Sequence, residues 1–110
     1  ILSGHIDDLI ASGAYREFYP HGVGHPIGMD VHDIQDLSHS AYNLEPGVMI
    51  TVEPGIYIPE SANVDSKWHG LGVRIEDDVY MTKSGPEVLT DKLAKTIPDI
   101  EDLMQSKDEI

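Results

Sequence analysis

Three histidines lie close together in a segment rich in glycine and proline. His21, His25 and His32 fall within twelve residues. A His-x-x-x-His pair on a helix would place both rings on one face, as in zinc peptidases with that motif. The intervening glycines and prolines exclude a helix here, and no glutamate follows the first histidine. We therefore expect imidazoles presented from extended backbone that approaches a ligand closely; surface or hydrogen-bonded core histidines are the alternative.

Carboxylates stand at two places in segments that have the pattern of strands. Glu53 ends the apolar run 48–53. In the run 72–81, period-two alternation places Arg74 and Glu76 on one face. Carboxylates gathered on one wall of a sheet repel each other unless a cation lies between them. A solvated strand end and an exposed ion-pair ladder are the simpler explanations.

Together these residues offer imidazole nitrogen and carboxylate oxygen as ligands, and the chain contains no cysteine. Such a donor set suits divalent Mn, Fe, Co or Zn. Two such ions about 3.5–4 Å apart can polarise a carbonyl group and hold a hydroxide between them. The residue types therefore give the hypothesis of a metal-dependent hydrolase.

The rest of the pattern predicts the elements that position these residues. Apolar residues at helical spacing predict a helix over 1–12 that stops at Gly13. Pro98 opens a last helix with acidic residues in its first turn. Between the helices, runs of β-forming residues separated by turn signals predict strands at 48–53, 56–58, 72–81 and 87–90. The predicted fold class is α+β with an antiparallel sheet.

Charge and composition narrow the class of partner. Twenty acidic residues against seven basic ones give a formal net charge of −13. Because nucleic-acid binding needs a basic surface, we expect no nucleic-acid partner, and the charge favours metal cations or a positively charged substrate end. No apolar run reaches the roughly 18 residues that span a membrane, so no membrane partner is expected. The absence of cysteine fits a reducing compartment, and we expect a cytoplasmic location.

The length allows one domain at most. The chain opens inside a helical pattern, without an initiator methionine or the basic and apolar regions of a signal peptide. We therefore expect residues 1–110 to be part of a longer polypeptide. A complete small domain with a processed end is the alternative.

Three ordered motifs resemble the pita-bread metallopeptidases, most closely the Xaa-Pro aminopeptidases (aminopeptidase P), with prolidase a near relative. The motifs are His-Gly-Val-Gly-His-Pro-Ile-Gly-Met-Asp-Val-His-Asp at 21–33, Leu-Glu-Pro-Gly to Thr-Val-Glu-Pro-Gly-Ile-Tyr at 44–57, and Gly-Leu-Gly-Val-Arg-Ile-Glu-Asp-Asp at 70–78. The resemblance covers nearly the whole chain. It implies that 1–110 is one partial catalytic domain, the C-terminal half of a pita-bread fold, with a curved antiparallel sheet and flanking helices.

The resemblance also implies a site for two metal ions, built from two aspartates, one histidine and two glutamates. His25 would be the histidine ligand. Glu53 would bind one metal and act as general base, and Glu76 would bridge both ions. The expected metal is Mn, with Co, Zn or Fe as alternatives.

Four further residues would serve the reaction without binding metal. His21 and His32 would line the pocket, with His32 stabilising the tetrahedral intermediate. Arg74, helped by Tyr57, would orient a metal-bound aspartate. The sequence departs from this family at His69, where a basic residue is expected, which puts substrate contacts from that loop in doubt.

The two aspartate ligands should lie upstream, and no aspartate of this chain is a good substitute. We therefore predict that the 110 residues alone bind metal weakly or at one site and are not a competent peptidase. The missing half would also leave a sheet edge and an apolar face exposed, which predicts self-association. A homo-oligomer is accordingly expected.

The implied activity of the parent protein is metal-dependent hydrolysis of an N-terminal Xaa-Pro bond, with a peptide carrying proline at position two as substrate. Three alternatives stay open. One is an Xaa-Pro dipeptidase (prolidase). Another is a pita-bread module that binds peptides or proteins without catalysis. The third is hydrolysis of a different bond, as in creatinase-like enzymes.

Overall fold

A computed structural model describes residues 4–33 and 43–105. Strand pairing is antiparallel throughout these residues, so the predicted α+β class is confirmed. In chain order the elements are helix α1 (Ile6–Ser12), 3-10 helix η1 (Ala14–Glu17), strands β1 (Met49–Val52) and β2 (Gly55–Tyr57), 3-10 helix η2 (Ser66–Trp68), strands β3 (Gly72–Arg74), β4 (Asp77–Thr82) and β5 (Gly85–Val88), and helix α2 (Ile97–Gln105).

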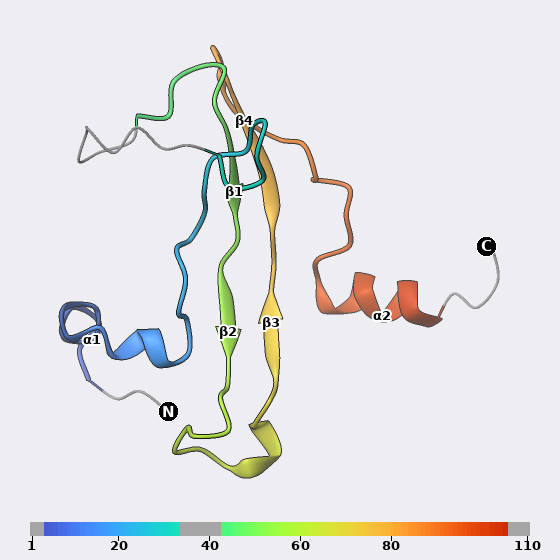
Figure 1. Ribbon diagram of the computed structural model, residues 1–110. Helices are drawn as coiled ribbons and strands as arrows, with labels where there is room; N and C mark the ends of the chain where they lie inside the picture. Colours follow the sequence, from blue (N-terminus) through green and yellow to red (C-terminus); the bar gives the residue numbers. More distant parts are fainter. Residues whose placement is uncertain (1–3, 34–42, 106–110) are drawn as a thin grey trace.

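A long two-part hairpin forms the centre of the molecule (Figure 1). One arm runs through β1 and β2, and the other returns through β3 and β4, so that β2 pairs with β3 and β1 with β4. Strand β5 adds to the outer side of β4, giving the order β1-β4-β5. The predicted single strand 72–81 is therefore wrong in one respect, because its ladder is interrupted at Ile75 and Glu76. Pro54 on the facing arm has no N–H to donate at this point.

Helix α1 ends as its sequence predicts, but its predicted start at residue 1 is wrong, because His5 is extended and caps a helix that begins at Ile6. The ring of His5 accepts a hydrogen bond from the backbone N–H of Asp7 (3.4 Å), a residue that also places negative charge in the first turn. Gly13 ends the helix with φ of 71°, a left-handed conformation that favours glycine. The predicted helical residues 1–3 lie outside the described part of the chain.

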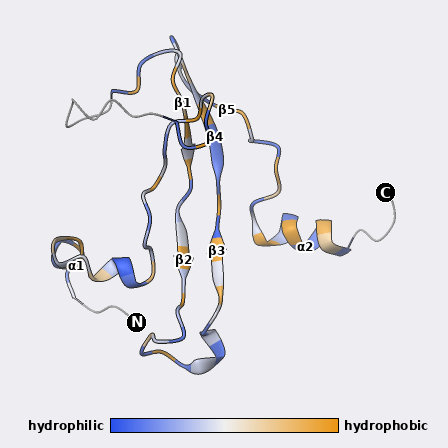
Figure 2. Ribbon diagram, viewed as in Figure 1, coloured by the Kyte–Doolittle hydropathy of each residue, from blue (hydrophilic) through white to orange (hydrophobic). Residues whose placement is uncertain are grey.

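Helix α2 stands away from the strands in Figure 1. It begins at Ile97, one residue before the predicted Pro98, because the Thr96 hydroxyl accepts from the backbone N–H of Asp99 (3.3 Å) and caps the first turn. Its apolar residues, visible in Figure 2, are exposed, with Met104 at 77%. No helix among the described residues has the length and apolar character needed to cross a membrane.

Little of the described chain is buried. Among the described residues, Pro26, Ala62 and Val79 are the buried apolar ones, and Thr51 is the buried polar one (3% exposed). On the β2–β3 pair, by contrast, Ile56 and Val73 are 59% and 62% exposed. The Cα radius of gyration is 17.7 Å, against about 13 Å for a compact domain of this length. These residues therefore form an extended sheet whose apolar faces are uncovered.

Candidate active site

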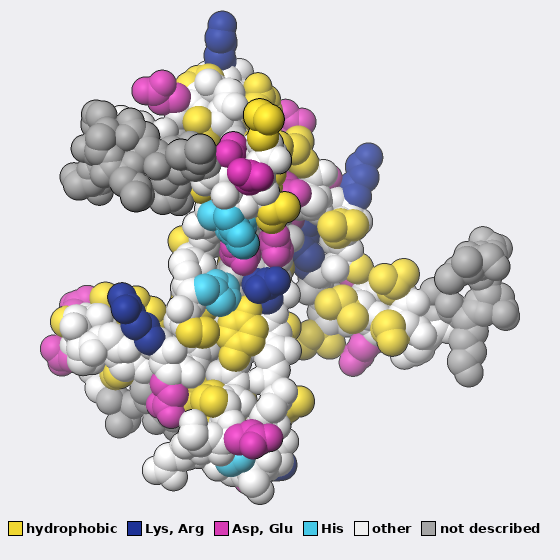
Figure 3. Space-filling model, in the orientation of Figure 1, with side chains coloured by type: hydrophobic (Ala, Val, Ile, Leu, Met, Phe, Trp, Pro, Cys, Tyr) yellow, Lys and Arg dark blue, Asp and Glu magenta, His cyan; other side chains and the backbone are white. Residues whose placement is uncertain are grey.

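The two glutamates singled out in the sequence lie in matching interruptions of the hairpin. The β1–β4 ladder ends at the pair Val52 and Asp77, and the β2–β3 ladder begins at the pair Gly55 and Arg74. Glu53 and Glu76 are therefore on facing arms between the two ladders. Figure 3 shows histidine, acidic and basic side chains gathered on one face at this level of the hairpin.

The histidine-rich segment runs beside β1 as an irregular extra strand. The backbone N–H groups of Thr51 and Glu53 donate to the carbonyl oxygens of His25 and Val23 (2.9 and 2.7 Å), and Ile27 N–H donates to Met49. This confirms the predicted extended backbone. It sets His25 directly against the strand end that carries Glu53.

Gly24 permits this close approach. A Cβ atom at position 24 would collide with the backbone carbonyl of Thr51. Glycine at this position therefore lets the segment lie flat against β1.

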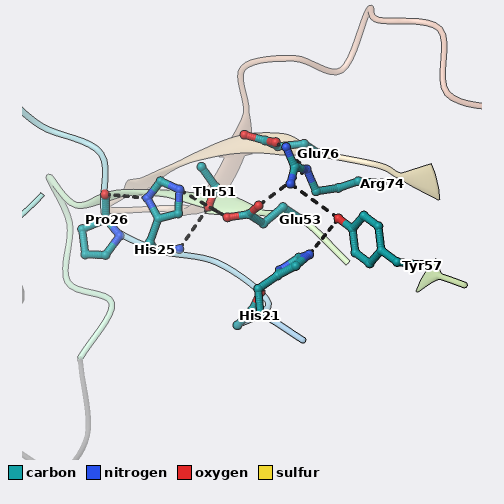
Figure 4. A network of polar contacts seen from close by, with 9 residues as sticks. His21, His25, Pro26, Thr51, Glu53, Tyr57, Arg74 and Glu76 are labelled. Carbon is teal, nitrogen blue, oxygen red and sulfur yellow. Dashed lines mark hydrogen bonds and ion pairs between the residues drawn. The ribbon is translucent and has the colours of Figure 1, made fainter. Parts of the chain in front are cut away.

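His25 and Glu53 meet in a largely buried contact (Figure 4). His25 Nε2 lies 3.2 Å from Glu53 Oε1, and the two side chains are 17% and 12% exposed. The other ring nitrogen, Nδ1, is 2.9 Å from the carbonyl oxygen of Pro26, which can only accept, so Nδ1 carries the proton. In a neutral ring the Nε2 lone pair then faces a carboxylate oxygen, an arrangement that calls for a proton or a cation between them.

Thr51 fixes the positions of both partners. Its buried hydroxyl accepts from the backbone N–H of His25 (3.0 Å) and donates to Glu53 Oε1 (3.1 Å). Thr51 and Glu53, two residues apart in the chain, therefore lie on one face. The role of Thr51 as a bridge was not predicted, because alternation gives the face of a side chain but not the neighbouring segment it reaches.

Arg74 lies between the two glutamates. Its Nε is 3.7 Å from Glu53 Oε2 and 3.5 Å from Glu76 Oε2, so the predicted common face of Arg74 and Glu76 is confirmed. The hydrogen bond with the Tyr57 hydroxyl raises the pKa of Arg74, and the two carboxylates add to this effect. Arg74 therefore stays charged and lowers the repulsion between the glutamates.

His21 and Tyr57 extend this network. His21 Nδ1 is 2.7 Å from the carbonyl oxygen of Gly22, so Nδ1 is again the protonated nitrogen, and Nε2 accepts from the Tyr57 hydroxyl (2.8 Å). Arg74 Nη1 donates to the same hydroxyl at 3.5 Å. The three side chains point toward one another in Figure 4.

His32 and His69 take different positions. The ring of His32 packs edge-on against that of His25, with centroids 4.2 Å apart, which places it beside the contact of His25 with Glu53. His69 is in the loop between β2 and β3, where Nε2 is 3.1 Å from the carbonyl oxygen of Ala62. Because a carbonyl oxygen only accepts, His69 donates this hydrogen bond, which links two residues of the same loop.

Tyr19 is a neighbour of the site that the sequence did not single out. Its ring meets His21 edge-on at 4.9 Å. Its hydroxyl is buried and has no hydrogen-bond partner among the described residues. Burial, and then the charge of Glu53, raise the pKa of this hydroxyl. The sequence pattern around Tyr19 does not indicate its contact with His21.

The donors fit a divalent cation by type, but too few of them converge for a site on their own. His25 Nε2 and Glu53 Oε1 are adjacent, and Glu76 joins them only through Arg74. In residues 4–33 and 43–105, no three such side chains are placed to hold one ion. The predicted ligands His25, Glu53 and Glu76 therefore lie at one end of the β1–β4 ladder, but they do not surround a single position that an ion could occupy.

The chain matches a known protein family and its solved structures. Residues 2–83 match metallopeptidase family M24. The Xaa-Pro aminopeptidase of Haemophilus influenzae is 51% identical over 105 residues, which cover 94% of this chain and 24% of that protein. Aminopeptidase P from Escherichia coli with the inhibitor Pro-Leu is 45% identical with a TM-score of 0.84, and the match covers 94% of this chain and 24% of that one. The zinc-substituted E. coli enzyme in complex with product is 43% identical with a TM-score of 0.87, covering 99% and 25%. The chain thus spans about a quarter of the length of these relatives.

Proposed function

The chain belongs to metallopeptidase family M24 and has part of its pita-bread fold, and from this premise we propose that the protein containing it hydrolyses the N-terminal Xaa-Pro bond of peptides. The observation that carries the proposal is the contact of His25 with Glu53, with Glu76 on the facing arm. The names of the similar proteins support the substrate class.

In this proposal residues 1–110 form one partial catalytic domain, and the rest of the protein supplies the other metal ligands. His25, Glu53 and Glu76 would bind two divalent ions together with two aspartates from that part. Mn is the expected metal, with Co, Zn or Fe as alternatives, because the donors are nitrogen and oxygen. Bound ions would lower the pKa of a water molecule and neutralise negative charge on the reacting carbonyl.

Glu53 is proposed to move the proton. Its Oε1 already contacts His25 and accepts from Thr51, so Oε2 is the oxygen left to take a proton from the attacking water. Glu53 would then deliver this proton to the departing proline nitrogen. Arg74, which lies 3.7 Å from Oε2, holds that oxygen in place.

The surrounding side chains are proposed to bind and orient. His32, beside His25, would donate to the oxyanion that forms at the scissile carbonyl. Tyr57 would fix the ring of His21 toward the substrate and support Arg74 from the other side. The acidic character of the chain favours a peptide with a free α-amino group, which accounts for cleavage at the N-terminus.

The decisive experiment compares two substrates on the complete protein loaded with Mn²⁺. Release of Xaa from an Xaa-Pro-Yaa tripeptide is the expected result. Cleavage of an Xaa-Pro dipeptide alone would assign the protein as a prolidase with the same residues. Bound metal without cleavage of either peptide would favour a binding module or hydrolysis of another bond.

The 110 residues alone provide a second test. We propose that they bind Mn²⁺ weakly or at a single site and do not cleave peptides, since the described residues hold no closed set of donors. A tight isotherm with two equivalents of Mn²⁺ in calorimetry would contradict this. A cytoplasmic location and a homo-oligomer also stay predictions, open to fractionation and light scattering of the complete protein.

A further inference from the structure

A second polar cluster lies next to the glutamates but does not face them. Lys95 Nζ donates to Asp77 Oδ1 (2.6 Å) and to the carbonyl oxygen of Thr90 (2.8 Å). The Thr90 hydroxyl donates to the same Asp77 oxygen (2.6 Å). Asp77, Thr90 and Lys95, which we name the clamp, are held by these three hydrogen bonds.

The clamp grips the last residue pair of the β1–β4 ladder. Asp77 pairs with Val52, and beyond this pair the ladder is interrupted. Glu53 follows Val52 directly, and Glu76 directly precedes Asp77. Because neighbouring strand residues point to opposite faces, Asp77 turns away from the face that carries Glu76. The clamp thus restrains the backbone next to both glutamates, and it does so from the opposite face of the sheet.

The chain after β5 forms hydrogen bonds with the same end of β4. Leu89 N–H donates to the carbonyl oxygen of Asp78 (2.8 Å), and Asp78 N–H donates to the Thr90 hydroxyl (3.1 Å). The segment 89–95 therefore continues the hydrogen bonding of β4 at the end where its partner strand stops. This segment lies downstream of the three motifs that resemble the family.

The burial of the clamp separates it from an ordinary surface ion pair. The side chains of Lys95 and Asp77 are each 26% exposed. The exposed pair of Lys67 and Asp65 in the loop between β2 and β3 has exposures of 63% and 58% and a distance of 3.1 Å. A shielded, charge-assisted network restrains its backbone more than an exposed pair does.

The ion pair of Glu76 restrains its side chain only weakly. Its side chain is 42% exposed, and its ion pair with Arg74 is long, at 3.5 Å. We propose that the Asp77–Thr90–Lys95 clamp is a positioning device that fixes the end of β4, and with it the backbone of Glu76 on the arm that faces Glu53. This inference rests on the proposed function, since it takes Glu76 as a metal ligand.

The test uses the complete metal-free protein titrated with Mn²⁺ by calorimetry. Lys95→Met removes the ammonium group and keeps the aliphatic chain, and Thr90→Val removes the hydroxyl with little change of shape. We expect each to weaken Mn²⁺ binding about 10-fold, the lower range for residues that support metal ligands. Lys95→Arg should restore most of the affinity. Lys67→Met, which breaks the exposed pair, is the matched control and should leave the affinity unchanged.

Hydrogen exchange of the metal-free protein gives a readout that does not depend on metal or substrate. Lys95→Met and Thr90→Val should raise exchange of the backbone N–H groups around Asp77 and Asp78, and Lys67→Met should not. Faster exchange there with an unchanged dissociation constant would show a merely structural cluster and overturn the proposal. Thr90→Val, the milder change, decides the matter if Lys95→Met does not fold.

The outcomes separate this inference from the proposed function. Wild-type protein that binds Mn²⁺ without cleaving Xaa-Pro peptides contradicts the proposed function, while the clamp is still judged by the affinities of its variants. If the wild-type protein cleaves Xaa-Pro peptides and both Lys95→Met and Thr90→Val leave the Mn²⁺ affinity unchanged, the positioning role of the clamp alone is overturned. Wild-type protein that binds no Mn²⁺ overturns both.

Discussion

The two halves of the central hairpin are built from similar strands but are held in different ways. The β1–β4 half is flanked by β5 on one side and by the histidine segment on the other, and it contains the buried residues Thr51 and Val79. The β2–β3 half is a bare two-stranded ribbon with Ile56 and Val73 exposed. The first half is positioned by the chain itself, whereas the second needs cover from outside it.

This difference explains why the contacts of the site differ in length and burial on the two sides of the interruption. On the β1 side, His25, Thr51 and Glu53 form short contacts between largely buried groups. On the β3 side, Arg74 and Glu76 form long contacts with side chains that are nearly half exposed. One part of the site is therefore preformed, and in the proposed function the other part is completed by the rest of the protein.

The largest expected effect is at Glu53, where the two halves meet. In the complete protein, Glu53→Gln removes the proposed proton acceptor and metal ligand while keeping the shape. We expect a loss of about 10³-fold in kcat on an Xaa-Pro-Yaa peptide. Glu87→Gln, on the exposed edge strand β5, is the matched control. A change of less than tenfold for Glu53→Gln would remove Glu53 from the mechanism.

The packing of the histidine segment on β1 is tested at Gly24. Gly24→Ala would push a methyl group against the Thr51 carbonyl, and we expect a loss of about 2 kcal/mol in the free energy of unfolding. Gly22→Ala is the control, because the nearest atom to its Cβ would be 3.7 Å away. Equal stabilities of the two variants in urea unfolding would show that the segment is not packed on β1.

Thr51 tests the preformed part of the site more finely. Thr51→Val keeps the shape but leaves the N–H of His25 without its partner and removes the hydroxyl that donates to Glu53 Oε1. We expect a loss of about 1–2 kcal/mol in stability, together with weaker Mn²⁺ binding. Calorimetry and urea unfolding of the complete protein measure both. If Mn²⁺ affinity is unchanged, the hydroxyl does not orient His25 and Glu53.

The bare half is tested by comparing two valines. Val79→Thr places a hydroxyl in a buried position (8% exposed), and Val73→Thr does so on the exposed face. If the rest of the protein covers β2 and β3, both should cost about 1 kcal/mol in the complete protein. A neutral Val73→Thr beside a destabilising Val79→Thr would show that this face stays open.

The 110 residues alone test whether the exposed face of β2 and β3 causes self-association. We expect them to self-associate in light scattering, and lysine at Ile56 and Val73 should reduce that association. An isolated chain that is already monomeric would contradict the prediction.

The smallest effect concerns the loop that joins β2 to β3. The backbone N–H of Lys67, and then its side chain, lower the pKa of Asp65. A carboxyl group whose pKa is lower in the folded state stabilises that state above the unfolded pKa, and this contribution is lost as pH falls through the folded pKa. An NMR titration should therefore show Asp65 ionising below the usual aspartate range. Lys67→Met should raise its pKa slightly, and an unchanged value would show that the side chain has no part in the shift.

Local chemistry was enough to predict much of the fold. Gly13 ends α1 because glycine adopts the left-handed conformation without strain, and period-two alternation put Arg74 and Glu76 on one face. The three motifs resemble those of the family, and the family match over residues 2–83 confirms that resemblance. Each of these signals is carried by residues that are close in sequence.

Tertiary structure alone decided which of these residues meet. The interruption that sets Glu53 opposite Glu76 depends on the pairing of two arms, which alternation within one strand does not specify. The hydroxyl of Thr51 reaches His25, 26 residues away, and Lys95 reaches Asp77 across 18 residues. Such contacts depend on how strands and loops lie against one another, and that placement is set by packing and backbone hydrogen bonds between distant segments.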